Sequence, residues 1–344
     1  MHNKRSLRAC KTLDTRAYST LTARHRKPPK RGFCIKHQAL TNTSYTYKPT
    51  SSSVTPLGVT EEAVHTQSSA PGRSCRIDEG MTAAVIDRFS GFAEQYDLVR
   101  PAPPDVVADV LCEIAATRTP ELVIDVGSGT GLSTRPWSHR AKRVVGIEPN
   151  DDMREQARRT TEAGNVSYVS ASANQTGQPD ASADIVTCVQ ALHWMEPTTT
   201  FAEVHRCLRD GGVFAAIDCD WPPFVHWELD AEWRRLHELA DELVASRGLS
   251  PGLEHWEKEG HLARMRSSGR FRSVTELAFH HRIEADAPRV VMLAKTQGGL
   301  ATALKAGLPE AHAALESFAY WSEKLLGGGR SWWTYIYRVR VGIK

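Results

Sequence analysis

The sequence has 344 residues, 41% of them hydrophobic and 24% charged, which suffices for the buried core of one large domain or two. Its net charge of +3 is uneven: Lys and Arg outnumber Asp and Glu by 14 to 5 in residues 1–80, but number 29 against 35 in residues 81–344. The mildly acidic larger part argues against a nucleic-acid partner. No apolar run reaches the ~20 residues of a membrane-spanning helix, so no membrane association is expected.

The cysteines indicate a reducing compartment. The seven are scattered and odd in number, and none has C-x-x-C or Cys/His spacing. We therefore expect free thiols, a cytoplasmic location and no metal site.

Residues 1–80 differ in kind from the rest of the chain. They are basic, rich in Ser and Thr, and lack periodic apolar positions, which predicts a disordered tail. Three interpretations stay open: a mitochondrial or plastid presequence, a basic tail that contacts an anionic partner, or a mistaken start upstream of a natural beginning at Met81. The first would make the location mitochondrial.

Two amphipathic helices are expected next. Apolar spacing predicts one over Thr82–Tyr96 and a second over Val106–Ala116, with a proline-rich break over Asp97–Pro104 between them.

The most informative stretch is Glu121–Leu132, ELVIDVGSGTGL. Its apolar run predicts a buried parallel strand. The glycines that alternate after it predict a turn that lets a ligand lie against the backbone. We expect a helix to follow, with its free N–H groups directed at that ligand.

An acid follows at the end of the second predicted strand, Arg143–Glu148. This position suits an acceptor for two ribose hydroxyls. The loop reads G-x-G-x-G, whereas dinucleotide sites read G-x-G-x-x-G, and Asp125 would repel a pyrophosphate. A positively charged nucleoside is therefore favoured over NAD.

The middle of the chain alternates strands and helices. Strands are expected at Val166–Val169, Asp184–Val189 and Val213–Ile217. Helices are expected at Asp151–Ala163 and Phe201–Leu208, the latter capped by Thr198–Thr200.

The C-terminal part is less patterned. Helices are predicted at Glu232–Ala245, His261–Met265 and Pro288–Lys305, and a strand at Phe271–Phe279. Ser331–Lys344 alternates and predicts a last strand, antiparallel to the fifth. Five arginines of this region are weak candidates for binding a carboxylate: Arg264, Arg266, Arg270, Arg272 and Arg282.

Several of these motifs resemble one family. VIDVGSGTG followed by VVGIEPN resembles the first two motifs of class I S-adenosylmethionine-dependent methyltransferases. The pattern F-x-x-x-A-x-x-Y-D-x-x-R-P (residues 89–101) and Q-A-L-H-W (190–194) resemble the type 11 domain, especially the trans-aconitate methyltransferase-like group. The resemblance implies an α/β fold over residues 81–344: a Rossmann-like, seven-stranded, mostly parallel sheet with helices on both faces. Residues 221–330 would include a helical lid over the acceptor site.

The resemblance also implies a site. His193 is expected to act as a general base on an acceptor hydroxyl, with the hydrogen-bonded loop histidine as the alternative. Tyr96 and Arg100 are candidates for the active-site rim, and the alternative for Tyr96 is the packed face of a lid helix. Asn174 stands where the family usually has an acid that binds adenine. The expected S-adenosyl-L-methionine contacts are Asp125, Gly127, Ser128, Gly129, Gly131, Glu148, Ala173, Asn174 and Gln190.

The implied activity is methyl transfer to an oxygen of a small molecule, either a carboxylate or a hydroxyl. The alternative is a binding module that holds S-adenosylmethionine without transferring its methyl group. A monomer or a homodimer is expected.

Overall fold

The structure is a computed structural model that describes Ile86, residues 90–249 and residues 255–344. The predictions made for residues 1–80 lie outside the described residues, as does most of the first half of the predicted entry helix.

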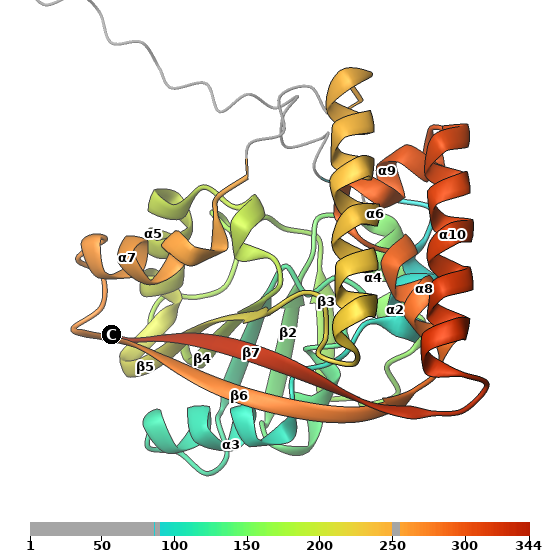
Figure 1. Cartoon of the computed structure of the whole chain (residues 1–344). Helices are drawn as coiled ribbons and strands as arrows, with labels where there is room; N and C mark the ends of the chain where they lie inside the picture. The colour runs from blue at the N-terminus through green and yellow to red at the C-terminus, as the bar shows by residue number, and fades with distance from the viewer. Residues whose placement is uncertain (1–85, 87–89, 250–254) are drawn as a thin grey trace, which may run out of the picture. The chain divides into compact units, whose positions relative to one another are not determined.

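A seven-stranded sheet forms the centre of the molecule (Figure 1). Its strand order is β3-β2-β1-β4-β5-β7-β6. The first five strands in this order are parallel, and β7 pairs antiparallel with both β5 and β6. The predicted seven-stranded, mostly parallel sheet is thus confirmed. The strands are β1 (Leu122–Val126), β2 (Arg143–Ile147), β3 (Val166–Val169), β4 (Ala183–Val189), β5 (Leu208–Cys219), β6 (Ser273–Ala285) and β7 (Ser331–Ile343).

The sheet is covered on both faces. In β1 every residue is buried, and successive side chains enter two different cores. Val123 packs with Val107 and Leu111 of α3 (Asp105–Ile114), whereas Ile124 packs with Phe201 of α5 (Pro197–Cys207). Burial on both faces explains the continuous apolar run of this strand.

The order of the strands sets the position of the site. From β1 the chain continues through β2 to β3 on one side, by way of α4 (Asp151–Arg159), and then returns to add β4 and β5 on the other. Open α/β sheets bind ligands at such a reversal, beyond the carboxyl ends of the strands. Here that place lies beyond β1 and β4.

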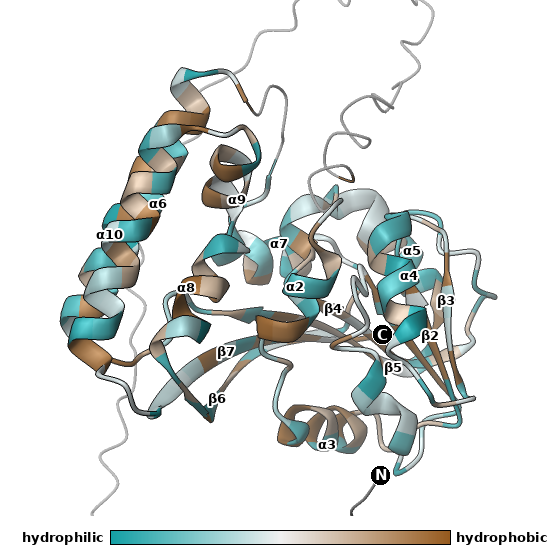
Figure 2. Ribbon diagram, turned by 90° about the vertical axis from the view of Figure 1, so that its right-hand side faces the viewer, coloured by the Kyte–Doolittle hydropathy of each residue, from teal (hydrophilic) through white to brown (hydrophobic). Residues whose placement is uncertain are grey.

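A helical layer packs against the start of β7 and the end of β6 (Figure 2). It consists of α6 (Trp227–Ser246), α8 (Ala287–Lys295), α9 (Gly298–Lys305) and α10 (Pro309–Leu326). Figure 2 shows these four helices grouped together, and α6 contacts both α9 and α10. Three aromatic residues of β7, Trp333, Tyr335 and Tyr337, are at most 1% exposed in the core beneath them. The predicted last strand, antiparallel to β5, is confirmed.

Some predicted elements were wrong. A turn at Ser90–Gly91 interrupts the proposed entry helix, and α2 is the shorter helix Ala93–Val99. The glycine loop continues through turns into the 3-10 helix η1 (Arg135–His139), with no α-helix before β2. The cap of α5 is Glu196, whose carboxylate accepts from the N–H groups of Thr198 and Thr199.

Other differences concern the C-terminal part. The single helix proposed for Pro288–Lys305 is divided into α8 and α9, and α10 was missed. The short helix α7 (His261–Ser267) and the strand β6 are present, each longer than expected. None of the described helices has both the length and the apolar character needed to cross a membrane.

Candidate functional site

The glycine loop lies at the carboxyl end of β1. Gly127, Gly129 and Gly131 all have positive φ, at +71°, +53° and +83°. A Cβ added at Gly127 would lie 2.6 Å from the Cβ of Ala191, so this glycine is also required for packing. A Cβ at Gly129 would meet no described atom within 4 Å. The backbone at Gly129 is therefore open to a ligand.

Glu148 supports this loop from the end of β2. It is 8% exposed, and its two oxygens accept from the N–H of Gly129 at 2.9 Å and that of Asn150 at 2.8 Å. Burial raises the pKa of the carboxyl group, and the two backbone N–H donors oppose that rise. Each carboxylate oxygen can accept a second hydrogen bond, so capacity for ribose hydroxyls remains beside the loop.

Asp125 has a different position. Its side chain is fully buried, and it accepts hydrogen bonds from the hydroxyls of Ser133 and Thr134 at 2.6 Å and of Thr187 at 2.8 Å. Burial raises the pKa of this carboxyl group, and the three hydroxyls oppose the shift. Asp125 therefore ties the two ends of the loop to β4.

A narrow cavity opens above the loop. Its volume is about 50 Å³. The hydroxyls of Ser128 and Thr130 are buried here without a partner among the described residues. A larger hollow of about 320 Å³ lies between α2 and α4, but no glycine-loop residue lines it, so we take the narrow cavity as the site. Its lining comprises Tyr96, Arg100, Pro101, Pro103, Gly127, Ser128, Gly129, Thr130, Leu132, Ser133, Val189, Gln190 and Trp221.

The structure gathers only part of the predicted site around this cavity. Tyr96, Gly127, Ser128, Gly129 and Gln190 line it. Gly131 packs instead against Tyr168, whose Oη lies 2.3 Å from the position of an added Cβ.

The proposed adenine contacts lie apart from the cavity. Ala173 and Asn174 belong to a turn after β3. Asn174 is exposed, and its side-chain oxygen accepts from the hydroxyl of Ser172 at 2.7 Å. The assignment of these two residues stays a prediction.

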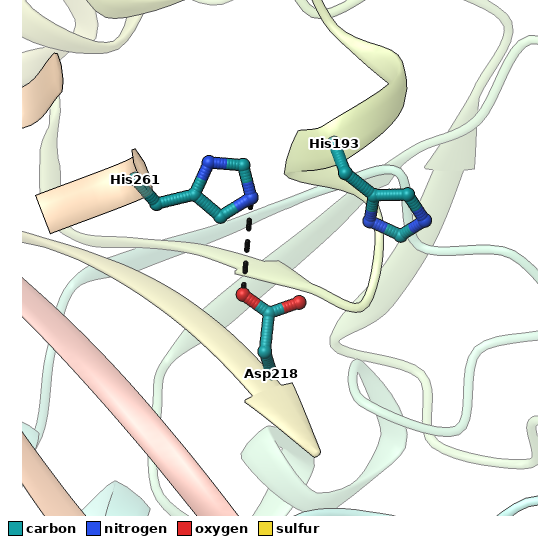
Figure 3. Close-up of side chains that lie close together, drawn as sticks. All are labelled: His193, Asp218 and His261. Carbon is teal, nitrogen blue, oxygen red and sulfur yellow. Dashed lines mark ion pairs between the residues drawn. The ribbon is translucent and has the colours of Figure 1, made fainter. Parts of the chain in front are cut away.

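His193 belongs to a buried polar cluster beside the cavity (Figure 3). One ligand-type atom from each of His193, Asp218 and His261 lies within 4.8 Å of the others. Nδ1 of His193, Oδ1 of Asp218 and Nε2 of His261 have no hydrogen-bond partner among the described residues. The three come from the loop after β4, the end of β5 and the start of α7.

Lys258 connects this cluster with the cavity. Its Nζ donates to Oε1 of Gln190 at 2.7 Å and lies 3.5 Å from Oδ1 of Asp218. Gln190 faces the cavity and has a positive φ of 55°. The other oxygen of Asp218 accepts from Nη1 of Arg340 at 2.7 Å.

Burial, with the positive charges nearby, keeps the two histidines of the cluster neutral. Burial, aided by Lys258, lowers the pKa of His193 well below its usual value. Burial and Arg264 lower the pKa of His261 to about 3. Burial raises the pKa of Asp218, against the effect of Lys258 and Arg340. A neutral His193 has a nitrogen, Nδ1, that can accept a proton, but burial and the neighbouring Lys258 oppose formation of the imidazolium.

The donor pattern favours an oxygen ligand for this cluster over a metal ion. Nη2 of Arg264 donates to Nδ1 of His261 at 2.8 Å, so the neutral ring carries its proton on Nε2. A metal needs that nitrogen unprotonated. Partners around a hydrogen-bonded oxygen, each about 2.8 Å away, lie about 4.6 Å apart when tetrahedral. The atoms of the cluster lie within 4.8 Å of one another, which is compatible with that arrangement.

Sequence reasoning found His193 but neither Asp218 nor His261. Asp218 was detectable in principle, as a polar residue at the end of a buried strand. His261 gave no signal, because only the fold brings α7 to the end of β5. None of the five arginines considered as carboxylate ligands is among the residues that line the cavity, whereas Arg100 is.

The fold and the loop together define a class. A sheet of this order, a glycine loop after β1 and an acid after β2 are the arrangement of class I methyltransferases, whose methyl donor is S-adenosylmethionine. Residues 124–216 match the family model described as a methyltransferase domain. The chain therefore contains a methyltransferase domain, and this domain includes the glycine loop, Glu148 and His193.

Known proteins with similar sequences or structures agree with this class. A putative methyltransferase of Dictyostelium discoideum is 30% identical over 126 residues, which cover 37% of this chain and 46% of that protein. A malonyl-[acyl-carrier protein] O-methyltransferase of Serratia marcescens is 31% identical over 131 residues, covering 38% and 50%. The chain thus spans about half the length of these relatives.

The same fold occurs in a solved structure, that of a putative type II methyltransferase from Anaeromyxobacter dehalogenans. The two structures superimpose with a TM-score of 0.55 at 24% sequence identity, and the match covers 71% of this chain and 97% of the other. The narrower likeness to the trans-aconitate methyltransferase-like group stays a prediction.

Proposed function

We propose that the protein transfers a methyl group from S-adenosylmethionine to an oxygen of a small molecule. The observation that carries the proposal is the cavity lined by Gly127 and Gly129, where the open backbone of Gly129 is supported by the carboxylate of Glu148. The match of residues 124–216 to a methyltransferase domain supports the choice of methyl donor.

The residues present fit this donor. The open backbone at Gly129 is available to its polar groups, and the second lone pairs of the Glu148 carboxylate to its ribose. S-adenosylmethionine supplies an already activated methyl group, so the protein mainly has to align donor and acceptor. Gly127 and Gly129 allow that alignment because they let the ligand approach the backbone.

The contacts of α6 and α8 with the cavity wall support the assignment of these helices to a lid over the acceptor. Trp221 lines the cavity and stacks on Trp233 of α6, with ring centroids 6.2 Å apart. Arg100 lines the cavity and donates to the backbone oxygen of Thr296, at the end of α8, at 2.7 Å. Movement of α6 or α8 would therefore displace a residue of the cavity wall.

The choice of an oxygen acceptor has two supports. The Serratia relative is named as an O-methyltransferase. In this chain, Nδ1 of His193 has no hydrogen-bond partner among the described residues and is unprotonated at neutral pH, so it can accept the proton of a hydroxyl. A carboxylate acceptor would need no base.

An acceptor screen tests the proposal. The protein is incubated with methyl-labelled S-adenosylmethionine and small carboxylic acids, phenols or amines, and labelled products are counted. Label in carboxylic acids or phenols is the expected result. Label in amines alone would refute the oxygen acceptor, and cofactor binding without transfer to any acceptor would favour a non-catalytic binding module.

His193 distinguishes the two oxygen acceptors. With a phenol, His193→Gln should lower kcat by about 100-fold, because the base is lost. With a carboxylic acid, the same variant should retain its kcat, because no proton has to be removed. Equal retention with a phenol would make His193 a structural loop residue. His226→Gln, at the start of α6 and outside the cavity lining, is the control.

A further inference from the structure

Arg100 is the one charged side chain among the described residues that line the cavity. It forms no ion pair with any described carboxylate, unlike the nearby Arg135, which pairs with Asp97 at 2.8 Å. Arg100 is only partly exposed, and a guanidinium in such a place is normally paired or bound to a ligand. We infer that Arg100 binds the carboxylate of a ligand in this cavity, an inference that rests on the proposed function.

Two contacts hold the guanidinium in place. Nε donates to Oγ1 of Thr296 at 3.0 Å, and Nη2 donates to the backbone oxygen of Thr296 at 2.7 Å. Nη1 makes no hydrogen bond with the described residues. Because the guanidinium is planar and rigid, fixing two of its nitrogens also fixes the direction of the third.

Aromatic rings flank the same group. Its Cζ lies 4.8 Å from the ring centroid of Tyr96 and 5.1 Å from that of Trp221. Both rings also line the cavity, so the cation is presented beside the glycine loop. Rings shield the charge from water without neutralising it, and a carboxylate arriving there would meet a partly desolvated cation.

The positive charge of Arg100 acts on its surroundings. Burial is the larger cause that lowers the pKa of His237 to about 4, and the charge of Arg100 is the second. A carboxylate forms charge-assisted hydrogen bonds with a guanidinium, and S-adenosylmethionine carries a carboxylate and no phosphate. It has two possible sources in the proposed reaction: the methionine end of the cofactor, or an acidic acceptor.

Calorimetry on the full chain separates the two sources. The first arm compares S-adenosylhomocysteine with 5′-methylthioadenosine, which has the same nucleoside but no carboxylate. The second arm titrates benzoate or citrate into protein saturated with S-adenosylhomocysteine. The variant is Arg100→Met, which keeps an unbranched side chain between the two rings. Arg282→Met is the matched control, since Arg282 also lies over a tryptophan ring, 4.9 Å from that of Trp332, but on β6.

In one expected result, Arg100→Met weakens S-adenosylhomocysteine by tenfold or more and leaves 5′-methylthioadenosine unchanged, which assigns the carboxylate to the cofactor. In the other, S-adenosylhomocysteine is unaffected, while benzoate or citrate binds the wild type and binds the variant at least tenfold more weakly. That result assigns the carboxylate to the acceptor. Arg100→Lys should restore part of the lost affinity, because it keeps the charge.

Two results would overturn the inference. If Arg100→Met binds S-adenosylhomocysteine as the wild type does, and no carboxylate probe distinguishes the two proteins, Arg100 is a structural link to α8 and the proposed function stands. If the wild type binds neither nucleoside, the proposed function fails and the inference with it. Unchanged affinity for 5′-methylthioadenosine shows that the variant is folded.

Discussion

At the scale of single residues, two buried acids, Asp125 and Glu148, stabilise the glycine loop in different ways. Asp125 accepts from three hydroxyls and is closed to solvent, so it stabilises the fold of the loop. Glu148 accepts from two backbone N–H groups, one of them at Gly129, whose other side is open. The acid that supports the open backbone is therefore also the one placed to meet a ribose.

Replacing Glu148 tests this assignment. Glu148→Ala should weaken S-adenosylhomocysteine by tenfold or more, because the variant loses both the ribose acceptor and the support of Gly129. The measurement is isothermal titration. Glu121→Ala is the matched control: Glu121 is exposed and lies at the opposite end of β1, where it pairs with Lys142 at 2.5 Å. Wild-type affinity in Glu148→Ala would rule out the ribose contact.

The site residues that could be predicted are those that local sequence determines. Gly127 and Gly129 follow a buried strand, and Glu148 ends the next one, so their positions follow from the parallel sheet. Arg100 was a candidate for the rim only because residues 89–101 resemble the family, and its contact with Thr296, 196 positions later, could not be predicted. The place of His261 likewise depends on packing between distant segments. No periodicity within either segment records such a contact.

At the scale of elements, α5 shows how a cap can be misjudged. Threonines at 198–200 suggested the cap, but Pro197 occupies the first helical position and the carboxylate of Glu196 accepts from two free N–H groups. Proline at that position and an acid before it both favour helix initiation. The cap lies two residues earlier than the threonine run indicates.

Substitutions at the two positions distinguish these caps. Glu196→Ala should lower the free energy of unfolding by about 1 kcal/mol, because two N–H groups lose their acceptor. Thr198→Ala should change it by less than about 0.5 kcal/mol, as expected for an exposed residue without a capping contact. Urea denaturation followed by circular dichroism measures both changes. A larger loss of unfolding free energy in Thr198→Ala than in Glu196→Ala would show that the threonine is the cap.

A second element-scale prediction concerns α6 and pH. The Nε2 of His237 is buried without a partner among the described residues, and its ring lies 4.7 Å from that of Trp233. Burial, with Arg100, lowers the pKa of His237 to about 4. The unfolded chain binds this proton below about pH 6.5, whereas the folded chain stays neutral to about pH 4. The contribution to stability is therefore complete above pH 6.5 and is lost as pH falls toward 4.

His237→Phe removes this titration. Between pH 7 and pH 5 the wild type should lose about 1–2 kcal/mol more of its free energy of unfolding than the variant does. Denaturant titrations at the two pH values give the difference. Identical losses in the two proteins would show that His237 takes up its proton equally in both states.

The elements that could be predicted from sequence share strong local signals. The strands β1, β2, β3 and β4 are short apolar runs, and their bounds match the structure to within one residue. The helix expected after the glycine loop did not form, because the hydroxyls of Ser133 and Thr134 bind Asp125 in a series of turns. The helix α10 was missed although its buried residues are spaced by three or four positions and Pro309 and Gly327 mark its two ends.

At the scale of the whole molecule, the described part has two regions with different tasks. The parallel half, β3 to β5, carries the glycine loop, the acid after β2 and the loop of His193. The antiparallel hairpin β6–β7 carries α8, α9 and α10 between its strands. The cavity is where the two regions meet, since Arg100 and Trp221 link its wall to α8 and α6.

This arrangement predicts a specific ligand response of the whole chain. At about 100 times its Kd, S-adenosylhomocysteine should stabilise the protein by about 2.7 kcal/mol, which raises Tm by about 5 °C or more for a domain of this size.

NAD at the same concentration should have no effect. A pyrophosphate binds the free N–H groups of a helix that follows the loop, and turns and a 3-10 helix follow this loop instead. Tyr168 also occupies the space beside Gly131. Differential scanning fluorimetry decides the matter: a shift with NAD and none with S-adenosylhomocysteine would mean that the loop is a dinucleotide site.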